Sequence, residues 1–136
     1  MLFVDTFTVP AATPAASPVS RELQIAHGII HQVEVVFLDG PENEVKVALR
    51  HGLHRVVPSQ PDASVVGNAE AVRIILWEPA EEPPYLVIIE AWSPDADYPH
   101  EVTVRVSILP REILLPPLPE LGLLKRIGRL LFGGAT

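Results

Sequence analysis

One stretch, residues 84–110, constrains the fold more than any other part of the sequence (PYLVIIEAWSPDADYPHEVTVRVSILP). Residues 85–92 are almost wholly apolar, which is typical of a strand covered on both faces. Residues 93–99 hold two prolines and two aspartates, the composition of a turn. Residues 101–108 alternate strictly between polar and apolar side chains, as a strand does when one face is buried. We therefore expect two long strands joined by a turn into a hairpin.

Short apolar segments with turn signals between them fill the rest of the chain up to residue 109. None of them shows a helical period over three turns. The pattern predicts an all-β domain over residues 1–109: a single antiparallel β-sandwich of about eight strands, jelly-roll-like or another Greek key. The six further strands are expected at residues 2–9, 19–26, 29–38, 45–50, 53–57 and 71–77. Residues 10–18 (PAATPAASP) are expected to be either a surface connection or an arm that lies across a neighbouring subunit.

Charge and composition exclude several classes of function. The net charge is −7, which argues against nucleic-acid binding by the sandwich, because phosphate neutralisation needs clustered Lys and Arg. The absence of cysteine excludes disulfides, thiolate metal sites and a cysteine nucleophile. No signal peptide and no apolar run of membrane-spanning length is recognisable, so we expect a protein that stays in the cytoplasm or assembles there into something larger.

The sequence changes character after the expected sandwich. Residues 108–119 (ILPREILLPPLP) hold four prolines and are expected to form neither a helix nor an interior strand. Residues 110–119 are therefore predicted to be a stiff, extended tether. Residues 120–136 are predicted to form an amphipathic basic helix. Its apolar face holds Leu123, Leu124, Ile127, Leu130 and Leu131, and its basic residues are Lys125, Arg126 and Arg129. Together with Phe132, these are the residues predicted to bind a partner.

This C-terminal helix has three possible docking partners. It could dock on its own sandwich, although the proline tether makes that awkward. It could lie in a membrane interface, since basic residues opposite a leucine face suit anionic lipid. It could also pack in a groove of a neighbouring subunit or another partner. We favour the protein groove first and the membrane second. A helix of this length is marginal when free, so it should be ordered only when docked.

Two pairs of histidines are close in sequence and are candidates for metal ligands. His27 and His31 are too far apart on one strand to share an ion, unless the chain bends between them. His51 and His54 flank a turn and could approach each other. The zinc-helix spacing HExxH is absent. We expect turn and surface histidines here, with no metal and no cofactor bound.

Carboxylates form two groups. Asp95 and Asp97 make a D-x-D pair of a kind that calcium can use, but turn capping explains them as well. Glu78, Glu81 and Glu82 lie in one expected loop, which we interpret as a solvated acidic segment. With no nucleophile elbow and no phosphate-binding glycine loop, the sequence predicts no catalytic residues and no enzyme.

Two tryptophans each lie at the end of an apolar strand, next to a loop that contains proline. Trp77 stands in WEP and Trp92 in WSP, and both could face the same rim of the sandwich. Packing at the edge of the core would explain them. They could also form an aromatic platform for a sugar or a partner protein.

Most of the domain, from Val9 to Ile108, resembles a loosely defined group of short β-sandwich proteins encoded by phages and prophages. The resemblance rests on TVPAATPAASPVSRELQIAHGIIHQVEVVF and on EEPPYLVIIEAWSPDADYPHEVTVRV. It implies a virion component, such as a capsid, decoration or tail-associated protein, and carries over no catalytic residue.

The leading hypothesis is a non-enzymatic structural protein of the virion, assembled in the host cytoplasm. Its expected partners are copies of itself and other virion proteins. The alternatives are a carbohydrate- or ligand-binding module that uses Trp77 and Trp92, and a membrane-associated protein anchored by its C-terminal helix.

Overall fold

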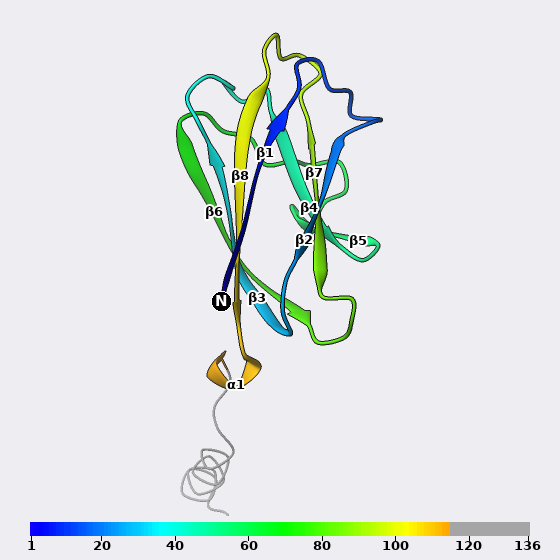
Figure 1. Ribbon diagram of the computed structural model, residues 1–136, viewed down its shortest axis with the longest axis vertical. Coiled ribbons are helices and arrows are strands. Elements are labelled where there is room, and N and C mark those ends of the chain that lie inside the picture. Colours follow the sequence, from blue (N-terminus) through cyan, green and yellow to red (C-terminus); the bar gives the residue numbers. More distant parts are fainter. Residues whose placement is uncertain (115–136) are drawn as a thin grey trace, which may run out of the picture.

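Eight strands and one helical turn make up most of residues 1–114, the part of the chain that the computed structural model describes (Figure 1). Most of the predicted tether and the whole predicted C-terminal helix lie outside these residues. No helix within residues 1–114 has the length and apolarity needed to cross a membrane. The elements are β1 (Leu2–Val9), β2 (Val19–Gln24), β3 (Gly28–Phe37), β4 (Lys46–His51), β5 (His54–Val57), β6 (Glu70–Ala80), β7 (Leu86–Trp92), β8 (His100–Leu109) and α1 (Arg111–Leu114).

The strands form two four-stranded antiparallel sheets, which confirms the predicted β-sandwich. One sheet has the order β1-β8-β3-β6, and the other has the order β2-β7-β4-β5. Only β4 and β5 are both consecutive in sequence and paired in a sheet. Every other connection therefore crosses from one sheet to the other, and the two sheets are seen as two layers in Figure 1.

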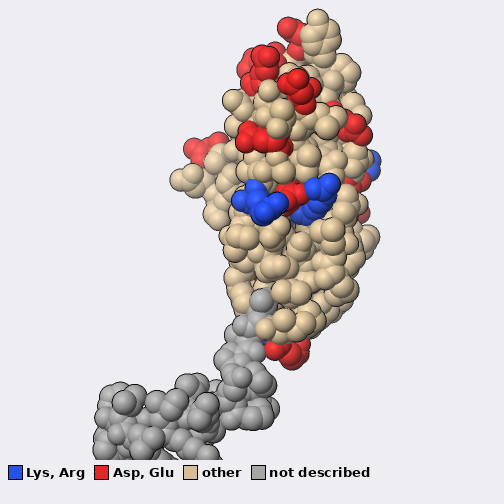
Figure 2. All heavy atoms as spheres, turned by 90° about the vertical axis from the view of Figure 1, so that its left-hand side faces the viewer, with Lys and Arg blue, Asp and Glu red and all other residues tan. Residues whose placement is uncertain are grey.

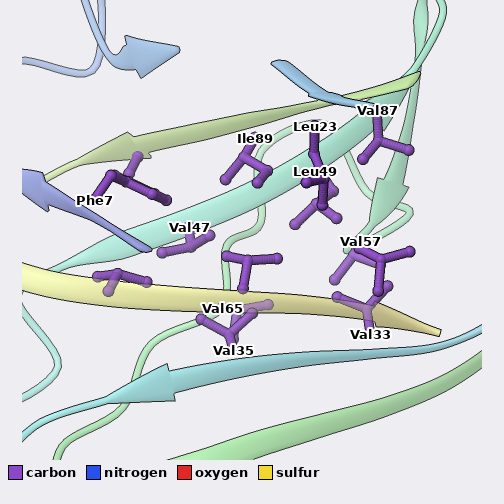
Figure 3. Packing of buried hydrophobic residues seen from close by; sticks show 14 of the residues in the cluster. Phe7, Leu23, Val33, Val35, Val47, Leu49, Val57, Val65, Val87 and Ile89 are labelled. Carbon is purple, nitrogen blue, oxygen red and sulfur yellow. The ribbon is translucent and has the colours of Figure 1, made fainter. Parts of the chain in front are cut away.

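The core lies between the inner faces of the two sheets. The alternation read in the sequence of β8 places four apolar side chains inward, and all four are fully buried: Val102, Val104, Val106 and Ile108. The opposite sheet contributes residues such as Val87, Ile89 and Leu49, which point into the same space (Figure 3). Burial of such a side chain contributes roughly 1.5–3 kcal/mol to folding, so this layer is the main stabilising feature.

The predicted hairpin of residues 84–110 is wrong. β7 and β8 lie in different sheets, and residues 93–99 cross between the sheets. Each strand buries one face against the core, so β7 and β8 meet through their side chains and not through backbone hydrogen bonds. The outer face of β7 is half-buried, so the strand is not covered on both faces as its composition predicted.

The segment of residues 10–18 packs against the crossing segment of its own chain. The amide of Ala12 donates to the carbonyl of Ala96, and the amide of Ser93 donates to the carbonyl of Thr13. The buried hydroxyl of Ser93 also donates to the carbonyl of Pro10. This part of the chain is thus a surface connection of the sandwich, and the expected arm across a neighbour is not what these contacts form.

Several strand ends differ from those expected by one or two residues, and two differences are larger in consequence. β6 continues to Ala80 through Glu78 and Pro79, which the sequence placed in a loop. An edge strand such as β6 tolerates proline, because at a position where the backbone nitrogen faces solvent the missing N–H costs no hydrogen bond of the sheet. At the other boundary, β8 is an interior strand that runs to Leu109, and α1 forms one helical turn where an extended tether was predicted. Proline is compatible with a helix start, and the carbonyl of Pro110 accepts from the amide of Ile113.

A core substitution tests this packing against a matched surface substitution. Ile89→Ala should lower the free energy of unfolding by about 2–5 kcal/mol, because Ile89 is fully buried in β7. Ile75→Ala removes the same side chain from an outward position of β6 that is 73% exposed, and should change stability by no more than about 0.5 kcal/mol. Urea unfolding of both variants measures the difference. Equal effects of the two substitutions would contradict the assigned inner and outer faces.

Candidate functional site

The outer face of the β1-β8-β3-β6 sheet carries exposed apolar side chains at both of its edge strands. On β6 these are Ile75, which is 73% exposed, and Trp77, which is 47% exposed. On β1 they are Leu2 and Val4. A strand with one face on the core is expected to place polar residues on the other face. β6 departs from this rule, since its inward residues are apolar as well.

Three charged side chains lie in the middle of this face. Glu34 of β3 accepts hydrogen bonds from Arg105 of β8 and from Arg73 of β6, the latter at 3.0 Å between Nε and Oε2. The side chains come together because the register places Glu34 directly opposite both arginines. These hydrogen bonds, the one from Arg105 first and that from Arg73 second, together with the two positive charges, lower the pKa of Glu34 below its ordinary value. The trio therefore carries one net positive charge.

The charges on this face are unevenly distributed. Figure 2 looks onto this side of the molecule and shows an acidic side chain between two basic ones at mid-height. Acidic side chains gather toward the upper end, where β6 begins at Glu70 and β8 begins near Glu101. Below the trio, most of the surface in this view is uncharged, and acidic side chains appear again at its lower end. The face thus offers a positive centre beside an apolar region, which suits an acidic or apolar protein partner.

The two tryptophans do not form a shared platform. Trp77 lies in β6 and Trp92 in β7, which belong to different sheets, and each points away from the core. The register also separates them along the strands. Trp77 lies near the end of the sandwich where β3 begins, whereas Trp92 lies at the opposite end, beside the crossing to β8. Of the two, only Trp77 belongs to the outer face described here.

The predicted partner-binding residues of the C-terminal helix lie outside the described residues. These are Leu123, Leu124, Lys125, Arg126, Ile127, Arg129, Leu130, Leu131 and Phe132. The described chain ends in α1, directly after β8. The segment that carries these residues therefore continues from an interior strand of the sheet whose outer face is exposed.

The remaining candidate residues lie at separate places in the fold. His27 packs edge-on against Tyr85, with 5.8 Å between the ring centroids, and does not join His31. Asp95 and Asp97 are exposed in the crossing segment. Within residues 1–114, the one group of three side chains whose ligand atoms lie close enough to share a metal ion is His51, His54 and Glu78.

The exposed apolar side chains on the outer face of β6 were not predicted, although the sequence held a signal for them. Residues 71–77 are mostly apolar at both odd and even positions, whereas a strand with one solvent-exposed face alternates between apolar and polar residues. The ion pairs of Glu34 had no comparable signal. They join residues 39 and 71 positions apart in the chain, and only the strand order brings them together.

Comparison of the chain with models of protein families and with curated proteins finds no match.

The lowered pKa of Glu34 predicts a pH dependence of stability. A carboxylate whose pKa is lower in the folded state stabilises the fold above the ordinary pKa of glutamate, about 4.3. That stabilisation is lost as the pH falls through the lowered pKa. Glu34→Gln should therefore be less stable than the wild type near neutral pH, and the difference should shrink as the pH falls below about 4.

Chemical unfolding across this pH range measures the effect. Glu22→Gln is the matched control, because Glu22 is exposed on β2 and makes no ion pair within the described part of the chain. A pH-independent difference between wild type and Glu34→Gln would contradict the role of the ion pairs.

Proposed function

We propose that the protein is a non-enzymatic structural subunit of a virus or phage particle, with a capsid, decoration or tail-associated role. It assembles with copies of itself, and with other virion proteins, through the outer face of the β1-β8-β3-β6 sheet and through its C-terminal segment. The observation that carries the proposal is the exposure of Ile75 and Trp77 on that face, beside the charged trio of Glu34.

The strand order supports the virion part of the proposal. We infer that the sandwich is a jelly roll, because β1-β8-β3-β6 faces β2-β7-β4-β5 and nearly every connection crosses between the sheets. Jelly rolls are common among viral capsid domains, and they also occur in lectins. The order therefore favours a capsid-type or carbohydrate-binding role, and the surface chemistry distinguishes the two.

A second copy of the chain fits the outer face by its charge. The trio presents a net positive charge in the middle of the face, whereas the protein as a whole carries −7, and most acidic side chains in the view of Figure 2 lie toward its upper end. The acidic end of one copy can thus approach the arginines of another, while Ile75 and Trp77 supply apolar contact. Such head-to-tail contacts build rings or extended assemblies, which are the geometries that particles use.

The C-terminal segment adds a second attachment in this proposal. Its predicted helix, residues 120–136, is basic and amphipathic, in a chain that is otherwise acidic. Residues 120–136 contain three basic residues and one acidic residue, whereas residues 1–119 contain seven basic and sixteen acidic residues. A basic leucine-faced helix suits an acidic neighbour more than it suits solvent. An anionic membrane surface is the alternative partner for this segment.

A carbohydrate-binding role is the second candidate, and Trp77 favours it. This half-exposed ring borders a hollow of about 450 Å³ that is also lined by His54, Arg55 and Ser59. An aromatic ring beside polar side chains can stack on a sugar. A glycan panel titrated against tryptophan fluorescence, with Trp77→Ala as control, should show saturation in this case. A flat response across the panel counts against it.

Self-association tests the leading proposal. Light scattering after size exclusion should give the full chain the mass of a dimer or a larger oligomer, a multiple of 14.9 kDa above the monomer mass. The double variant Ile75→Ser/Trp77→Ser should weaken association at least about tenfold, because it removes the apolar contact that β6 supplies to the proposed interface. A chain ending at Leu109 should also associate less, since it lacks the C-terminal segment.

Leu53→Ser is the matched control, because Leu53 is a fully exposed apolar residue in the β4–β5 turn of the other sheet, away from the outer face and from the acidic end. It should leave the mass unchanged. A monomeric full chain, or double-variant and truncated chains that keep the wild-type mass, would overturn the proposal.

A further inference from the structure

A second site lies where the edges of the two sheets meet, at β5 and β6. β4 ends at His51 and β5 begins at His54, with the tight turn of Gly52 and Leu53 between them. Gly52 has a φ of 64°, which favours glycine and lets the strands reverse at once. The two histidines are directly opposed in register, with 6.0 Å between their ring centroids. The turn thus presents two imidazoles side by side.

A third side chain, that of Glu78, reaches the two histidines from the opposite sheet. Glu78 of β6 directs its carboxylate at both rings, so that Oε2 lies 2.7 Å from Nδ1 of His51 and 3.2 Å from Nε2 of His54. Its other oxygen, Oε1, lies 3.3 Å from the same nitrogen of His54. The ligand atoms of all three residues fall within 4.8 Å of one another. Two ring nitrogens and a carboxylate therefore face a common point.

We propose that His51, His54 and Glu78 form a binding site for a divalent transition metal ion, best matched by Zn²⁺. Two ligand atoms that bind zinc tetrahedrally at about 2.0–2.1 Å stand roughly 3.3 Å apart. The separations between His54 and Glu78 already have this value, and the pair of His51 and Glu78 needs only about half an ångström more. The two ring nitrogens lie within 4.8 Å of each other, and side-chain rotations would bring them to the same separation in a metal-bound site.

The chemistry of the ligands selects the class of ion. Imidazole nitrogen suits Zn²⁺, Ni²⁺ and Cu²⁺, whereas Mg²⁺ and Ca²⁺ require a shell made almost entirely of oxygen. Two histidines and one glutamate are a ligand set that zinc accepts, with the fourth position taken by water or another ligand. The site is open on the side that this fourth ligand needs, because His54 is 63% exposed.

The surroundings favour a cation. The three residues line a hollow of about 590 Å³, whose wall also includes Glu81 and Glu82. Glu81 is paired with Arg111 at 2.9 Å, and within residues 1–114 Glu82 makes no ion pair, so it adds negative charge at the rim. Two arginines of the hairpin flank the histidines in sequence: Arg50 is bound to Glu90, and Arg55 donates a hydrogen bond to the carbonyl of Ala63. Three carboxylates, those of Glu78, Glu81 and Glu82, thus line the hollow, and carboxylates favour the approach of a cation.

Metal binding would have a structural consequence. The ion would connect the β4–β5 turn to β6 and so join the two sheets along one side of the sandwich. On the other side, Arg21 of β2 binds Asp5 of β1 through two hydrogen bonds of 2.9 and 3.0 Å. A ligand that binds only the folded state raises its stability by mass action, so the ion should raise the melting temperature.

Calorimetric titration of the full chain with Zn²⁺ alone, on protein without a histidine tag, tests the site. We expect one ion per chain and a higher melting temperature in its presence. His54→Gln and Glu78→Gln should each weaken binding at least about tenfold and reduce the thermal shift, because each removes one of three ligands. His54 is exposed, so its replacement leaves the fold intact, as the melting temperature without metal will verify.

His100→Gln is the matched control, since it removes a histidine at the start of β8, at the other end of the sandwich. It should bind Zn²⁺ as the wild type does. A full chain that shows no saturable uptake, or whose affinity is the same in His54→Gln and Glu78→Gln as in the wild type, would overturn the proposal. Substitution by Co²⁺ gives a further readout: a visible absorption band that is present in wild type and His100→Gln and lost in His54→Gln.

Discussion

The apolar contact between the inner faces of the two sheets is the interaction on which the rest of the structure depends. Val104 and Val106 of β8 face Ile89 of β7 across this layer, and all three are fully buried. Because side chains alternate along a strand, burying one set also decides which side chains point outward. A slip of one residue in β6 would bury Ile75 and Trp77 and expose Ile74 and Leu76. The proposed interface therefore exists because the core holds the register.

The open sides of the sandwich depend on polar contacts. A β-sandwich has two sides where edge strands of different sheets lie next to each other without backbone pairing. Here one side is joined by Asp5 and Arg21, and the other by Glu78 with His51 and His54. Arg21 also lies over the ring of Phe7, at 5.8 Å from its centroid, so the first contact protects the core as well. The second contact has the ligands of a metal site, which gives that side a function beyond closure.

Much of the fold could be predicted from local patterns, because they record which face of a strand is buried. The alternation in residues 101–108 gave the correct inner face of β8, and turn residues separated all eight strands. Pairing was not predictable in this way. Residues 93–99 have turn composition, yet they cross between sheets, since an alternating strand is satisfied equally by a partner beside it or across the core. Pro79 likewise suggested a loop, because its tolerance in β6 depends on that strand lying at an edge.

The sites were predictable only where their residues are neighbours in sequence. His51 and His54 were recognised as a pair able to approach, because a turn lies between them. Glu78 could not be added, since it reaches them from the other sheet, 24 and 27 residues away. The same holds for Glu34 and its two arginines. Trp77 and Trp92 show the reverse error: similar local sequences suggested one rim, and the topology placed them in different sheets.

The emission of Trp77 measured as a function of protein concentration tests the central claim, that the outer face of the β1-β8-β3-β6 sheet is where copies of the chain meet. In a Trp92→Phe chain, Trp77 is the only tryptophan. It is half-exposed in the single chain, so assembly through this face should shift its emission to shorter wavelength and protect it from acrylamide as the mass rises. Emission and quenching that stay constant while the mass increases would show that copies meet elsewhere and would contradict the account.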